Sequence, residues 1–165
     1  MPDIYIKVDG IPGEATEEKH VGWGVALSLN WGASQPHATA SAGGGARGGI
    51  SRCEHQDLVI TKYLDKMTPP LNLHCCNGKR IPKITIDICR QVDTKLVYMQ
   101  YELEGALVRS TSIYADGSGS DEKPTEEVAF AYEKITQKYT EVDAKTNKPA
   151  GDTMTWADLV SNTYG

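Results

Sequence analysis

The stretch VGWGVALSLNW, residues 21–31, constrains the fold more than any other part of the chain, because large and small side chains alternate along it without a break. The odd positions carry valine, leucine and tryptophan. The even positions carry Gly22, Gly24, Ala26, Ser28 and Asn30. A period of two is typical of a β-strand with one buried face. We therefore predict one strand whose odd face lies in the core and whose even face is small and uncharged, unlike an ordinary solvated face.

The same alternation recurs elsewhere and predicts a mainly β, antiparallel fold. Strand patterns occupy residues 3–8, 81–90, 95–114 and 126–142. The pattern at 95–114 fits two strands, or one long strand bent at Gly105. Within 126–142 the apolar positions shift phase, which predicts a β-bulge near Glu133 or Lys134. About seven strands of this kind indicate a β-barrel or a compact sandwich, and we expect an antiparallel β-barrel.

One short α-helix is predicted, at about residues 69–77, flanking the barrel. Thr68 is a suitable N-cap, and Pro69 fits the first helical position, where its missing N–H group costs nothing. The pair Asn77-Gly78 is a stop signal. A chain of 165 residues with 39% hydrophobic residues and no visible repeat is expected to form one domain, residues 1–165.

A long glycine-rich loop is expected at residues 33–49, with Arg47 as its only formal charge. Such long connections are usually functional or disordered, so the loop is either a surface linker or a segment that orders against a partner. The residues that define it are Gly43, Gly44, Gly45, Arg47, Gly48 and Gly49. The sequence GGGARG formally matches G-x-G-x-x-G, but a strand pattern and not a helix follows it, which argues against nucleotide binding.

Charge and hydropathy exclude several classes of function. A net charge of −5 argues against a nucleic-acid partner, and no apolar run is long enough to insert into a membrane. The segment MPDIYIKVDG lacks the features of a signal peptide, so we expect a protein made in the cytoplasm. Its four cysteines are expected to remain free thiols. The acidic pairs Asp121-Glu122 and Glu126-Glu127 are expected to be solvated.

Thiol and imidazole side chains are the candidates for a metal or catalytic site. The side chains concerned are Cys53, His55, His74, Cys75, Cys76 and Cys89. None of them shows the ligand spacing of a zinc site. Cys53 and His55 would share one strand face, but no third group that would orient the imidazole is apparent. We therefore expect no metal, no cofactor and no catalytic activity.

Several segments, taken in order, resemble one family. They are DIYIKVDGIPGEATEEKH, then GW with LSLNWG, the glycine-rich loop, QDLVITKYLDKMTPPL, and CCNGK. Over nearly the whole chain they are similar to the haemolysin-coregulated protein family, Hcp, the tube subunit of bacterial type VI secretion systems. The resemblance implies a β-barrel with a flanking helix, six copies in a ring, and rings stacked into an expelled tube. It also implies a spike protein at the tip, a contractile sheath, small effector proteins in the lumen, and secretion without a signal peptide.

Two sets of site residues follow from this resemblance. Ala26, Ser28 and Asn30 would line the lumen and contact cargo, because small uncharged side chains would keep a channel open. The glycine-rich loop would mediate stacking of rings. The alternative that remains is a monomeric β-barrel that binds a small ligand in its interior.

Overall fold

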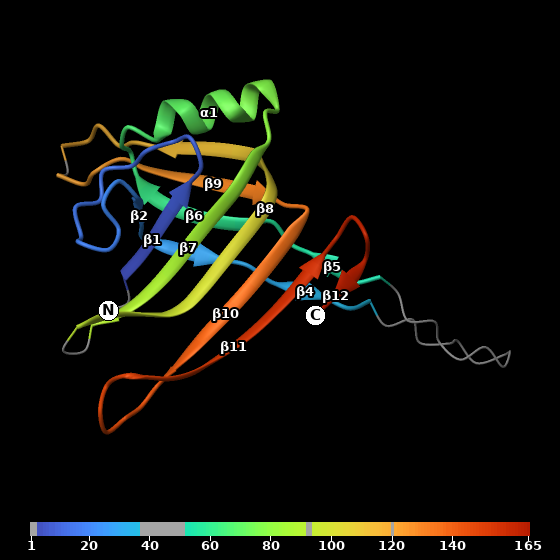
Figure 1. The fold of residues 1–165 in the computed structure, drawn as a ribbon. Coiled ribbons are helices and arrows are strands. Elements are labelled where there is room, and N and C mark those ends of the chain that lie inside the picture. The colour runs from blue at the N-terminus through green and yellow to red at the C-terminus, as the bar shows by residue number, and fades with distance from the viewer. Residues whose placement is uncertain (1–2, 37–51, 92–93, 120) are drawn as a thin grey trace, which may run out of the picture.

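The computed structural model describes residues 3–36, 52–91, 94–119 and 121–165 (Figure 1). Its one helix within these ranges is α1 (Thr68–Asn77). The strands are β1 (Asp3–Val8), β2 (Gly24–Ala26), β3 (Ser28–Asn30), β4 (Ala33–Ser34), β5 (Glu54–His55), β6 (Leu58–Tyr63), β7 (Ile81–Gln91), β8 (Lys95–Tyr114), β9 (Thr125–Ala131), β10 (Lys134–Val142), β11 (Pro149–Asp158) and β12 (Thr163–Tyr164). The prediction of a mainly β chain with one short helix is confirmed.

Two antiparallel sheets share the long strand β8. The first has the order β12-β11-β10-β8-β7-β1-β2, and the second runs β3-β6-β9-β8. β8 changes sheets at Gly105, whose φ is 60°. A Cβ atom at this glycine would lie 2.5 Å from the carboxylate of Glu133, a half-exposed side chain that can move, so it is the backbone angle that favours glycine. Of the two readings of residues 95–114, the single bent strand is therefore correct.

The β2–β3 segment connects the two sheets on the side opposite β8. The Leu27 N–H group, between β2 and β3, donates to the carbonyl oxygen of Thr61 in β6 at 2.7 Å. Among the described residues, strand pairing does not form one continuous closed sheet. The expected barrel is thus built as two sheets joined by two bent segments, with α1 packed against β8 (Figure 1).

The core lies between the sheets and beneath α1. Its largest fully buried apolar side chains are Phe130, Ile6, Leu58, Ile60, Met67, Leu71, Ile81, Ile84, Ile86, Leu103 and Ile135. Buried positions recur at every second residue of β6 and at Ile4, Ile6 and Val8 of β1, as the period-two pattern requires. Burying each of them contributes about 1.5–3 kcal/mol to stability.

The stretch 21–31 is not one strand with one buried face. Gly24 and Ala26 are buried, whereas Val25 and Leu27 are 47% and 46% exposed. The prediction that the odd face is core is therefore wrong for β2. The phase reverses where the chain passes from one sheet to the other. As predicted, Leu29 and Trp31 pack against the main core, and Trp23 packs against a second buried cluster of Tyr5, Ala15 and Cys89.

Close packing explains the small side chains of β2. A Cβ atom at Gly24 would lie 2.5 Å from the Met67 sulfur atom and 3.0 Å from a methyl group of Ile6. Ala26 belongs to the same core cluster and is 6% exposed. Small residues are needed there because β2 approaches the start of α1 closely, not because that face is free.

The helix α1 confirms the predicted range and stop signal. Gly78 follows its last residue with a φ of 66°, and the Gly78 N–H group donates to the His74 carbonyl oxygen. The N-cap is Met67, one residue earlier than predicted. The hydroxyl of Thr68 instead accepts a hydrogen bond from the Asp65 N–H group and donates one to Glu126.

The phase shift near Glu133 is a change of sheet and not a β-bulge. β9 pairs with β6 and the second half of β8, whereas β10 pairs with the first half of β8 and with β11. The chain leaves one sheet and enters the other at this point, so the buried side switches. β10 and β11 then form a long hairpin that extends away from α1 (Figure 1).

Candidate functional site

The predicted lumen residues do not share one environment. Ala26 is a core residue, so its assignment to a free channel face is wrong. Ser28 and Asn30 lie on β3 and are exposed. They pair with Thr61 and Val59 of β6, respectively.

Strand register extends the exposed side of β3 across the whole second sheet. Directly paired residues point to the same side of a sheet. The pairings place eight side chains on this side, which we call the small-residue face: Ser28, Asn30, Val59, Thr61, Ser110, Ser112, Glu127 and Ala129. The opposite side carries Leu29, Ile60 and Val128, which belong to or pack against the core. Glu127 is the only charged residue among the eight.

The glycine-rich loop falls largely outside the described residues. Gly43, Gly44, Gly45, Arg47, Gly48 and Gly49 all lie in the undescribed range 37–51. The residues on either side of this range form the two-stranded sheet of β4 and β5, in which Ala33 pairs with His55.

The structure does not bring Cys53 and His55 together as a nucleophile and base. The Cys53 sulfur atom lies 3.9 Å from the carbonyl oxygen of Glu54. His55 Nδ1 is buried without a hydrogen-bond partner, and burial, with a further contribution from Arg52, lowers the pKa of this imidazole. The carboxylate of Asp57, which lines the same small depression, is already paired with Arg109 at 2.9 Å.

The remaining cysteines also lie apart. Cys89 is fully buried, and burial raises the pKa of its thiol to about 11, which keeps it protonated and unreactive near neutral pH. Cys75 is half-buried on α1, whereas Cys76 is exposed. Within the described ranges, no group of three His, Cys, Asp or Glu side chains could hold a metal ion.

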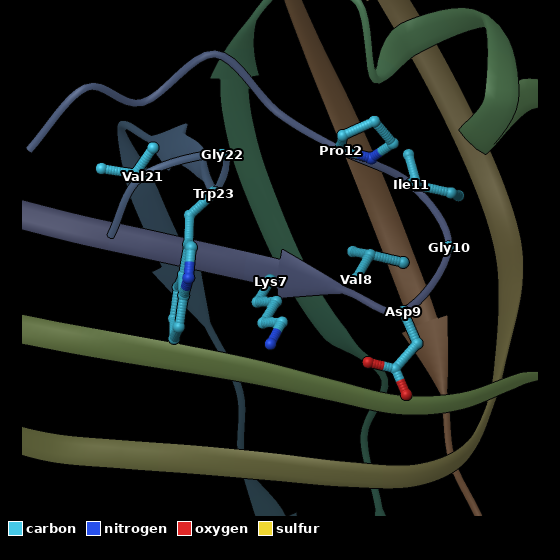
Figure 2. A pocket seen from close by; sticks show the side chains of 9 residues that line it. All are labelled: Lys7, Val8, Asp9, Gly10, Ile11, Pro12, Val21, Gly22 and Trp23. Carbon is cyan, nitrogen blue, oxygen red and sulfur yellow. The ribbon is translucent and has the colours of Figure 1, made fainter. Parts of the chain in front are cut away.

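An open depression of about 430 Å³ lies beside the end of β1. Figure 2 shows Val21 and Trp23 on one side of it and Ile11 and Pro12 on the other. Its glycines, Gly10 and Gly22, both have positive φ angles and shape the two turns that border it. The core residues Val8 and Ile11 contribute to its lining, but the depression is open at the surface, so it is not the enclosed interior cavity of a ligand-binding barrel.

A buried ion pair was missed by the sequence prediction, which placed Glu126 on a solvated surface. Lys62 is fully buried and contacts the carboxylates of both Glu126 and Asp65. Glu126 itself is 2% exposed. The signal was present in the pattern, since Lys62 continues the core positions Leu58 and Ile60, and Glu126 precedes the core positions of β9.

Residues 5–139 match the family described as "Type VI secretion system effector, Hcp". The chain belongs to the Hcp family. The matched segment runs from β1 into β10 and contains all eight residues of the small-residue face, whereas β11 and β12 lie beyond it. The resemblance predicted from the motifs is thereby confirmed.

Solved structures and a known relative agree with this family. A structure described as that of a type six secretion system protein is 28% identical with a TM-score of 0.90, and the match covers 100% of both chains. Hcp1 from Salmonella typhimurium is 25% identical with a TM-score of 0.79, over 99% of each chain. Protein hcp1 of Pseudomonas aeruginosa is 33% identical over 97 residues, which is 58% of this chain and 59% of that relative's length.

Among the residues that the structure describes, no helix is long and apolar enough to span a membrane.

Proposed function

We propose that this chain is a tube subunit of a type VI secretion system. Six copies form a ring, rings stack into the inner tube, and small effector proteins travel in the lumen. A spike protein caps the tube and a contractile sheath drives it. The subunit is made in the cytoplasm and leaves the cell through this machine. Membership of the Hcp family is the observation that supports the proposal most strongly.

The small-residue face is the proposed lumen surface. It spans the four strands β3, β6, β9 and β8, and seven of its eight residues are serine, threonine, alanine, asparagine or valine. Short side chains leave space in a channel, and a single carboxylate, Glu127, selects little by charge. The face therefore fits a passage for varied proteins better than it fits a specific ligand pocket, which would need convergent polar groups.

Negative-stain electron microscopy with light scattering tests the assembly. Sixfold rings with an open centre are the expected result for the purified protein. Particles with the mass of a monomer would contradict the tube proposal. They would favour the alternative, a monomeric barrel that binds a small ligand.

Deletion of residues 42–49 is expected to abolish long tubes and leave rings intact. The proposed reason is that the glycine-rich loop mediates stacking, because its small uncharged residues allow close approach between copies. Electron microscopy of the wild type and the deletion variant under tube-forming conditions measures the effect. Tubes of normal length in the variant would show that the stacking role of this loop is wrong.

Asn30→Arg is expected to preserve the ring and to reduce retention of effector proteins. Asn30 is exposed on β3, so a longer side chain would project from the small-residue face. The measurement compares the amounts of small proteins that co-purify with the wild-type and variant rings. Asn77→Arg, at the exposed end of α1, is the matched control and should retain cargo. A lower melting temperature with unchanged cargo in Asn30→Arg would instead indicate a packing role.

A further inference from the structure

A hollow of about 410 Å³ lies at one end of the second sheet. Its lining comes from the residue between β2 and β3, the last residue of β6, and the residues that lead into and begin β9: Leu27, Tyr63, Asp121, Glu122, Lys123 and Thr125. Leu27 is 46% exposed and Tyr63 is 44% exposed. The hollow therefore presents apolar surface that no other described residue covers.

Two carboxylates and an aromatic ring give this hollow a preference for a cation. The side chains of Asp121 and Glu122 are exposed, and neither makes a hydrogen bond or an ion pair with another described residue. The ammonium group of Lys123 lies 5.6 Å from the centre of the Tyr63 ring instead. A guanidinium group fits such a surface best, because it pairs with carboxylates and also stacks on aromatic rings.

The hollow and the root of the glycine-rich loop lie at opposite ends of the same sheet. β6 runs from Leu58, close to β5, to Tyr63 in the hollow. β3 runs in the opposite direction, from Ser28 beside Leu27 toward β4. Figure 1 accordingly shows β4 and β5 on the far side of the sheet from the connection between β8 and β9. Head-to-tail stacking of identical rings needs such an arrangement, because one end of a ring must fit the opposite end of the next.

The glycine-rich loop has the charge and the length to enter the hollow of another copy. Arg47 is the only formally charged residue between positions 33 and 49, and most of its neighbours are glycine or alanine. Small neighbours allow its guanidinium group to approach a pair of carboxylates closely. Residues 37–51 lead away from β4 and return to β5, so they can reach at most about 25 Å from these strands.

We propose that the hollow receives the glycine-rich loop of a second copy of this chain in the next ring. Arg47 of that copy pairs with the carboxylates of Asp121 and Glu122 and packs beside the Tyr63 ring. This inference rests on the proposed function, since it presupposes rings that stack. The contact repeats for each subunit of a ring, so a weak individual contact is enough to hold two rings together.

Sedimentation velocity of the full chain at increasing protein concentration tests the contact by measuring the fraction of rings in stacks. Asp121→Lys with Glu122→Lys places two cations opposite Arg47, so the concentration needed for stacking should rise about tenfold or more. Addition of Arg47→Glu to this variant should return that concentration toward the wild-type value. Glu14→Lys with Glu141→Lys makes the same change in net charge at exposed positions outside the hollow and should stack like the wild type.

The outcomes separate this contact from the tube proposal on which it rests. Intact rings of the Asp121→Lys, Glu122→Lys variant that stack at the wild-type concentration would overturn the hollow as the acceptor and leave the tube function standing. An equal loss of stacking in the control variant, or no recovery with Arg47→Glu, would overturn it as well. Absence of rings in the wild type would overturn the tube function, and the contact between rings with it.

Discussion

Lys62→Met is expected to lower the free energy of unfolding by about 3–5 kcal/mol. The ammonium group of Lys62 contacts Glu126, lies 2.6 Å from Asp65, and donates to the carbonyl oxygen of Tyr63 at 3.2 Å. Its side chain is fully buried, and that of Glu126 is 1% exposed. Removal of the cation leaves a carboxylate in the core without its charge partner. The cost is large because water cannot reach that carboxylate.

Urea denaturation followed by circular dichroism measures this loss. The matched control is Lys138→Met, whose ion pair with Asp152 is 3.3 Å long and about half exposed, and which should cost less than about 1 kcal/mol. The double variant Lys62→Met with Glu126→Met should recover part of the loss, because no unpaired carboxylate remains at position 126. Equal stabilities of the two lysine variants would show that burial of the Lys62 pair has no energetic consequence.

Phe130→Ala is expected to cost about 3–5 kcal/mol. Phe130 is the only phenylalanine of the chain and is fully buried. It lies near the end of β9, opposite Leu58 of β6 and Val108 of β8, and belongs to the main core cluster. Truncation to alanine leaves a cavity that these strands can close only by moving.

The same denaturation experiment compares Phe130→Ala with two control variants, Phe130→Leu and Tyr139→Ala. Phe130→Leu should retain most of the stability, because leucine fills most of the volume. Tyr139→Ala removes an aromatic ring that is 49% exposed on β10 and should have a much smaller effect. A loss in Phe130→Ala no greater than that in Tyr139→Ala would contradict the central place of Phe130 in the core.

Local patterns in the sequence predict β1, β7, β8 and the helix well, because alternation and capping depend on neighbouring residues. The range of α1 and the bend of β8 at Gly105 both follow from such signals. The burial of Gly24 and Ala26 does not follow from such local signals. Their small size comes from contact with Met67 and Ile6, and no local pattern reveals which distant side chain will lie against a strand.

The same limit applies to the site residues. Alternation identifies Ser28 and Asn30 as one side of a strand, but only the register with β6, β9 and β8 shows that this side continues across a sheet. The buried His20 contacts the carboxylates of Glu17 and Asp87, and its contact with Asp87 cannot be inferred from spacing in the sequence. A charged residue at a core position of an alternating pattern, such as Lys62, indicates a buried ion pair and should be read as such from the sequence.

The position of β1 has a consequence for the order of events during synthesis. β1 leaves the ribosome well before β7, yet in the finished sheet it lies between β2 and β7, with Asp3 paired to Cys89. At a translation rate of about 5–20 residues per second, β7 follows on the order of 4–16 seconds later. During that delay Ile4, Ile6 and Val8 have no partner on the β7 side. One edge of β1 therefore stays unpaired until β7 is made, and a chaperone that shields β1 would act in this interval.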